Sequence, residues 1–68
     1  MKTNVEMLDK MIEASGLKIT YLAEKCGISR TSFYKKKTGQ VEWTASEIAA
    51  LREELHLTLT QTKDIFLI

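Results

Sequence analysis

The sequence contains no proline, one cysteine, one histidine and three glycines in 68 residues. A single cysteine excludes an intramolecular disulfide, and the lack of proline suits a helical chain with short loops. No apolar run reaches the length of a membrane-spanning helix, and no N-terminal stretch has the pattern of a signal peptide. We therefore expect a single domain over residues 1–68 and a cytoplasmic location.

Side chains that carry out catalysis or bind metals are equally scarce. His56 and Cys26 have no partners of the kind that a metal or nucleophile site needs, and there is no glycine-rich phosphate loop. The adjacent carboxylates Glu53 and Glu54 point in different directions if they lie on a helix. Cys26 is best interpreted as a small buried apolar residue. The sequence thus predicts no enzyme, no cofactor and no metal site.

The net charge of +1 hides a strongly uneven distribution. Residues 18–40 contain six basic side chains and one acidic side chain, whereas the rest of the chain contains four basic and eight acidic ones. Such polarity would attract a polyanion to one face of the molecule, although a run of charge can also be a merely solvated surface.

Three segments have the pattern of a helix start. In Thr3-Asn4-Val5-Glu6, Thr44-Ala45-Ser46-Glu47 and Thr58-Leu59-Thr60-Gln61, a hydroxyl and a carboxylate or amide stand three residues apart, as in a capping box. The helices that follow are expected to run to about Ser15, to about Leu55 and over about 59–66.

Two short amphipathic segments lie between these helices, over about 19–26 and 30–37. They flank the turn Gly27-Ile28-Ser29, where the glycine can adopt positive φ and the serine can cap the second segment. Leu22 and Phe33 point inward. A glycine turn between two short helices is typical of a helix-turn-helix.

This stretch resembles the helix-turn-helix of the Cro and phage-repressor (XRE) family. The resemblance implies an all-α, five-helix, lambda-repressor-like DNA-binding domain, with the second and third helices forming the helix-turn-helix. The matching residues are Leu22-Ala23, Gly27-Ile28-Ser29, Arg30, Phe33 and Gly39.

Two positions depart from the family pattern. Lys18 stands where the family usually has a serine or threonine cap, and Lys36 stands where a large apolar residue is usual. Lys36 is expected to bury its stem and expose its ammonium.

The resemblance implies binding of double-stranded DNA, with the helix at 30–37 in the major groove. The residues expected to read bases are Arg30, Thr31 and Tyr34, with Ser29, Ser32 and Lys35 beside them. The residues expected to bind phosphate are Lys18, Thr20, Tyr21, Lys36, Lys37, Thr38, Gln40 and Thr44.

Trp43 and the apolar C-terminus each allow two interpretations. Trp43 is expected to cover one end of the core, and the alternative is a phosphate contact through its indole N–H. The tail Ile65-Phe66-Leu67-Ile68 either closes the core or pairs two subunits. Four consecutive large apolar residues cannot all face inward from one helix, so the sequence predicts a homodimer through this tail.

The functional prediction is a phage or prophage Cro-like repressor. Members of the family usually bind two-fold symmetric operators as dimers, with recognition helices about 34 Å apart. The alternative is a protein-interaction module with the same fold, such as an antirepressor, a modulator or an antitoxin, whose partner would be another phage regulator.

Overall fold

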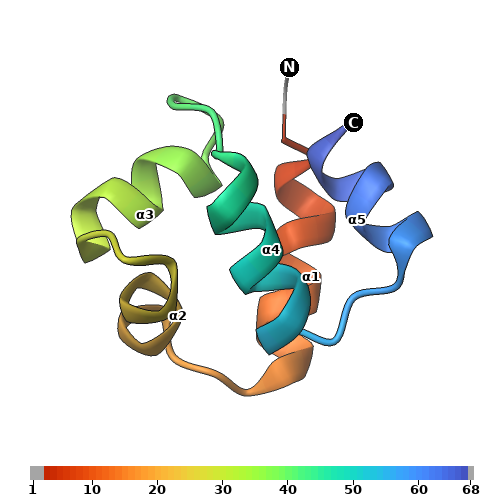
Figure 1. Cartoon of the computed structure of the whole chain (residues 1–68), viewed down its shortest axis with the longest axis horizontal. Coiled ribbons are helices and arrows are strands. Elements are labelled where there is room, and N and C mark those ends of the chain that lie inside the picture. Colours follow the sequence, from red (N-terminus) through yellow and green to blue (C-terminus); the bar gives the residue numbers. More distant parts are fainter. Residues whose placement is uncertain (1–2, 68) are drawn as a thin grey trace.

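The structure is a computed structural model that describes residues 3–67, and this range contains five α-helices and no strand (Figure 1). The predicted all-α fold, with a helix-turn-helix in its second and third helices, is confirmed. The helices are α1 (Val5–Ser15), α2 (Ile19–Cys26), α3 (Arg30–Lys37), α4 (Ala45–Glu54) and α5 (Leu59–Phe66).

The capping boxes predicted for α4 and α5 are present. Thr44 and Thr58 each accept a hydrogen bond from the backbone three residues on, and the side chains of Glu47 and Gln61 accept from the backbone of the caps. These reciprocal bonds satisfy amides that the first turn of a helix leaves without an acceptor.

The helix start predicted at Thr3 is wrong by one residue. Asn4 is the N-cap of α1, and its Oδ1 accepts from the Met7 backbone N–H at 3.2 Å. The Asn4 backbone N–H also donates to the Ile65 carbonyl at 2.6 Å. This long-range bond holds the backbone at Asn4, one residue after Thr3. Asparagine caps a helix as well as threonine does.

The corner between α2 and α3 has the expected geometry. Gly27 has a φ of +74°, its N–H donates to the Glu24 carbonyl, and the N–H of Ile28 donates to the Ala23 carbonyl. This is a Schellman ending, which requires a residue in the left-handed region. A Cβ at Gly27 would contact no other atom, so the backbone conformation itself is what favours glycine here.

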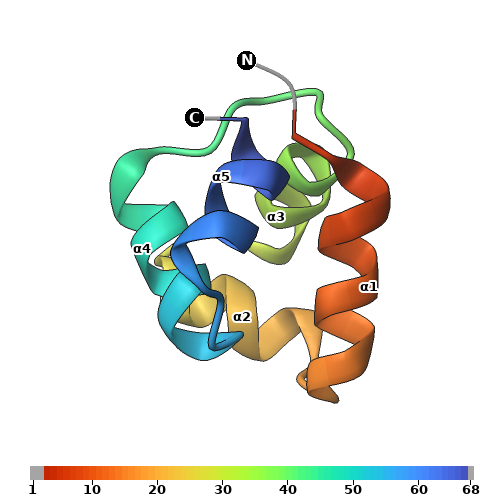
Figure 2. The ribbon, with the colours of Figure 1, turned by 90° about the vertical axis from the view of Figure 1, so that its right-hand side faces the viewer.

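The helix-turn-helix occupies one end of the molecule. Helix α2 packs on α3 and α4, α1 packs on α3 and α5, and α4 packs on α5. Figure 1 shows α2 and α3 together at one side and α5 at the other, and Figure 2 looks onto α5 with α3 behind it.

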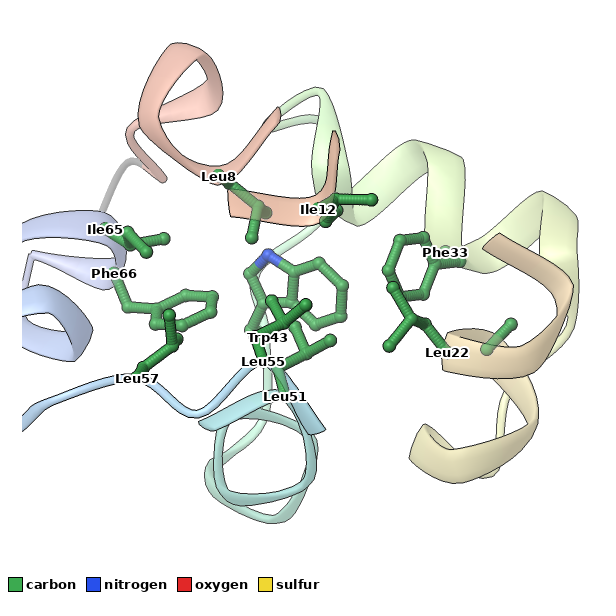
Figure 3. Close-up of a cluster of buried hydrophobic side chains, with 11 residues drawn as sticks. Leu8, Ile12, Leu22, Phe33, Trp43, Leu51, Leu55, Leu57, Ile65 and Phe66 are labelled. Carbon is green, nitrogen blue, oxygen red and sulfur yellow. The ribbon is translucent and has the colours of Figure 1, made fainter. Parts of the chain in front are cut away.

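Trp43 lies in the middle of the core, as Figure 3 shows. Its ring meets Phe33 and Phe66 edge to face, with centroid distances of 5.1 and 5.9 Å, and 8% of the residue is exposed. The packing interpretation of Trp43 is confirmed. The phosphate alternative is wrong, because the indole N–H is buried.

The structure corrects part of the dimerisation prediction. Ile65 and Phe66 are 0% and 3% exposed and belong to the core, so they have no surface to offer a second subunit. Two neighbouring residues fit within one broad apolar stripe of a helix. Leu67, with a φ of +56°, ends α5 and is 51% exposed. Ile68, the fourth residue of the predicted interface, lies outside the described residues.

Membrane insertion finds no support in the helices. Between residues 3 and 67, none has the length and hydrophobicity that crossing a membrane requires.

Candidate nucleic-acid interface

The two sides of α3 differ sharply in burial. Phe33 points into the core and has no exposed surface, which fixes the rotation of the helix. Arg30, Thr31, Tyr34 and Lys35 are exposed, as the sequence predicts for residues that read bases. The first turns of α3 therefore present a guanidinium, a hydroxyl, a phenol and an ammonium to solvent.

Ser29 and Ser32 have a structural task at the start of α3. The Ser29 hydroxyl oxygen accepts from the Ser32 backbone N–H at 3.1 Å, which confirms Ser29 as the cap. The same hydroxyl donates to Ser32 Oγ at 3.1 Å. Ser29 is exposed and Ser32 is half-buried. Both lie beside the reading residues, but their polar atoms already stabilise the turn.

The start of α2 lacks the side-chain cap that the other described helices have. Lys18 is the N-cap and accepts no hydrogen bond from the first turn. In contrast, Asn4, Ser29, Thr44 and Thr58 cap their helices. Amides without an acceptor and the positive end of the helix dipole favour an anion, and the Lys18 ammonium adds to this.

Thr20 and Tyr21 lie in this exposed first turn of α2. The Tyr21 hydroxyl donates to Oε1 of Glu54 on α4 at 2.7 Å. This hydrogen bond, with a smaller effect of burial and of the Glu54 charge, raises the pKa of Tyr21. The Tyr21 hydroxyl is thus engaged by a carboxylate, so a phosphate contact at this turn depends on the backbone N–H groups, as the sequence predicts.

The end of α3 corrects the expectation for Lys36. Its ammonium is not exposed: Nζ donates to Oε1 of Glu47 at 2.5 Å, and the two side chains are 11% and 7% exposed. The same carboxylate oxygen accepts from the Thr44 backbone N–H at 2.9 Å. One buried carboxylate therefore holds both the capping box of α4 and the lysine of α3.

Glu47 stays ionised despite its burial. Burial alone would raise the pKa of its carboxyl, but the hydrogen bonds from Lys36 and Thr44 and the Lys36 charge together lower it. Cys26 lies against this pair, with Sγ 3.8 Å from the Glu47 carbonyl. Burial, and next the Glu47 charge, raise the pKa of the Cys26 thiol to about 11. The thiol is thus protonated at neutral pH, in keeping with a packing role.

Lys37 is held in a similar way by a different helix. Its Nζ donates to Oδ1 of Asp9 on α1 at 2.5 Å, and its side chain is 17% exposed. The Tyr34 ring lies beside the same ammonium, 5.9 Å from centroid to Nζ. As the chain is folded, the ammonium groups of both Lys36 and Lys37 are bound to carboxylates of the protein.

The remaining predicted phosphate ligands are exposed at the loop after α3. The Thr38 hydroxyl donates to the Tyr34 carbonyl at 2.9 Å, and the Gln40 amide donates to that hydroxyl at 3.2 Å. Thr44 is exposed too, but its backbone N–H is directed to Glu47. The start of α4 is therefore closed by its own carboxylate, unlike the start of α2.

Sequence reasoning missed the carboxylate partners Glu47, Asp9 and Glu54. One signal was present for Glu47. Lys36 comes three residues after the inward-facing Phe33, on the same side of the helix. A lysine placed there is buried only if a carboxylate meets it. The two other partners lie on distant helices and leave no local signal.

Residues 7–61 match the family model of the Cro/C1-type HTH DNA-binding domain. The chain belongs to this family. In helix-turn-helix proteins, the second helix of the motif lies in the major groove, with its N-terminal residues at the base edges. Neither a curated protein nor a solved structure matches the chain. Within residues 3–67, no three or more side chains of histidine, cysteine, aspartate or glutamate form a group that could hold a metal ion.

Proposed function

We propose that the chain is a sequence-specific transcriptional regulator, a phage or prophage Cro-like repressor that binds a two-fold symmetric operator as a homodimer in the cytoplasm. The observation that carries the proposal is the rotation of α3 in a Cro/C1-type domain. Phe33 is fully buried, whereas Arg30, Thr31 and Tyr34 of the same helix are exposed.

The reading chemistry follows from these three side chains. Arg30 can donate two parallel hydrogen bonds to O6 and N7 of guanine. Thr31 can bond a base edge or touch a thymine methyl, and Tyr34 can contact a base or a phosphate. A helix with its side chains is about 10–12 Å across, close to the width of the major groove of about 12 Å. The exposed side of α3 can therefore enter the groove.

Phosphate contacts would come from both flanks of α3. The uncapped start of α2, with Lys18 and Thr20, offers amides and positive charge on one flank. On the other flank, Lys35, Thr38 and Gln40 are exposed. Such contacts orient the protein without reading sequence, and they make binding sensitive to salt. DNA binding of this kind needs no cofactor.

The size of the molecule favours a dimer on DNA. One copy extends 26 Å along its longest axis and carries one α3. Two consecutive half-sites lie about 34 Å apart, so one copy can serve only one of them. Because Ile65 and Phe66 are buried, the surface for a second copy must involve other residues, such as the exposed Leu67.

One observation favours a second function, the binding of another protein. An open groove of about 610 Å³ lies between α4 and α5 and is lined by Ile48, Ala49, Leu57 and Leu59. Leu59 is 56% exposed, so its apolar side chain on the wall of this groove is available to a partner. A regulator can use both surfaces, since the groove does not include residues of α3.

The experiment is a selection of duplexes from a random pool by the purified chain at near-physiological salt, followed by sequencing. We expect enrichment of a two-fold symmetric site with half-sites about one DNA turn apart. Weak, salt-sensitive binding without enrichment would contradict a sequence-specific repressor. In that case, a Leu59 substitution that abolishes regulation, with an Arg30 substitution that does not, would identify the protein-binding function.

A further inference from the structure

Three consecutive lysines end α3, and the structure divides them. The Lys35 side chain is exposed, whereas those of Lys36 and Lys37 are 11% and 17% exposed. The sequence predicts an exposed ammonium for all three, with Lys35 beside the base-reading residues and Lys36 and Lys37 as phosphate ligands. Lys36 is the most buried of the three, and its burial points to a role inside the folded protein.

The Lys36 ammonium cannot leave its carboxylate cheaply. Glu47 is itself 7% exposed at the side chain and bound to the Thr44 backbone N–H. If Lys36 turned to a phosphate, the Glu47 carboxylate would stay buried without its cation. Removing one partner of a buried pair is far more costly than replacing both. The pair is thus expected to persist when DNA binds.

The pair also connects two parts of the fold that do not otherwise pack. Within residues 3–67, α3 packs on α1 and α2, and α4 packs on α2 and α5. The Lys36–Glu47 contact joins the last turn of α3 to the first turn of α4. It therefore restrains the end of the helix that presents Arg30 and Tyr34.

We propose that Lys36 is a positioning residue, which fixes α3 through the buried Glu47 carboxylate, and that it makes no phosphate contact when the protein binds DNA. This rests on the proposed function. Of the two neighbours Lys35 and Lys36, only Lys35 then releases counterions from DNA.

The test measures how the DNA affinity falls with salt for matched variants. K36M/E47Q removes the ion pair, keeps the net charge and keeps an acceptor for Thr44, because glutamine also completes a capping box. K35M removes one exposed lysine. All variants are measured at a temperature at which circular dichroism shows them folded.

We expect K36M/E47Q to keep the slope of log affinity against log salt, and K35M to reduce it by about 0.9. The positioning role is measured separately, by the ratio of the affinity for the selected site to the affinity for random duplex. E47Q alone, which leaves Lys36 buried without a carboxylate, and K36M/E47Q, which removes the contact altogether, should both lower this ratio several-fold.

A slope that falls as much in K36M/E47Q as in K35M would overturn the inference while leaving the proposed function intact. An unchanged affinity ratio in E47Q would overturn the positioning role. A wild-type chain that binds no duplex even at low salt would contradict the proposed function, and with it this inference.

Discussion

The polar side chains along α3 differ in what they contact. Arg30, Thr31 and Tyr34 are exposed and have room to meet DNA. In the last turn, the ammonium groups of Lys36 and Lys37 are each 2.5 Å from a carboxylate of the protein. The basic run at the end of α3 is therefore not uniformly available to a phosphate.

The starts of α2 and α4 also differ in whether a carboxylate of the protein already occupies them. The α4 start is closed by the Thr44–Glu47 capping box, whereas the α2 start has Lys18 as its cap and no side-chain acceptor. The Glu47 carboxylate accepts the hydrogen bond of the Thr44 backbone N–H at the start of α4, whereas no side chain caps the first turn of α2. We therefore propose the start of α2 for anion binding, whereas the start of α4 is already closed by the capping box.

The largest effect is expected from Glu47→Ala. It leaves the Lys36 ammonium buried without a carboxylate and removes half of the capping box. Breaking a buried pair in this way should lower the free energy of unfolding by about 3–5 kcal/mol. Urea denaturation measures it, with the exposed Glu53→Ala on the same helix as the control. Equal stability of the two variants would show that the end of α3 is not held by this pair.

Arg30→Ala should change recognition and leave stability unchanged, because Arg30 is exposed. Loss of a bidentate guanine contact should reduce discrimination at one position of each half-site by about 1–3 kcal/mol. Affinities for the selected site and its single-base variants measure this. Arg52→Ala, an exposed arginine of α4, is the control. A uniform loss across all duplexes would reassign Arg30 to a phosphate.

Lys18→Ser should give the start of α2 the side-chain cap that the start of α4 already has. Lys18 already has the extended backbone of an N-cap, with φ of −80° and ψ of 147°. A serine cap should raise the free energy of unfolding by about 1 kcal/mol and weaken DNA binding, since the charge is lost and the amides gain an acceptor. Thermal unfolding and duplex titration measure the two effects. An unchanged DNA affinity would count against the α2 start as a phosphate site.

The smallest and most gradual effect concerns pH. Because folding lowers the pKa of Glu47, its contribution to stability is complete above the ordinary glutamate pKa of about 4.3 and is lost as pH falls through the lower folded value. The stability difference between the wild type and Glu47→Gln should therefore shrink at acidic pH. Urea denaturation at several pH values measures it, and a difference that grows on acidification would reverse the assignment.

The helices themselves were predictable because their signals are local. The Gly27 turn and the caps at Thr44 and Thr58 are each defined by residues within four positions of one another. Asn4 was missed because its bond to Ile65 joins opposite ends of the chain.

Only part of the site could be predicted from the sequence, because some of its contacts are not local. The exposure of Thr31 and Tyr34 follows from the inward direction of Phe33. The partner of Lys36 depends on how α4 is placed against the helix-turn-helix, which no local pattern encodes. The burial of Ile65 and Phe66 likewise depends on Trp43 reaching the centre of the core.

An amide NMR titration of the chain with a duplex from the random-pool selection would locate the DNA-binding surface. We expect the largest shift changes at the start of α2, over residues 19–21, and over residues 29–35 of the turn and α3, with α5 nearly unchanged. Largest changes in α4 and α5, around Leu59, would contradict this expectation, because the duplex would then lie on the face away from Arg30.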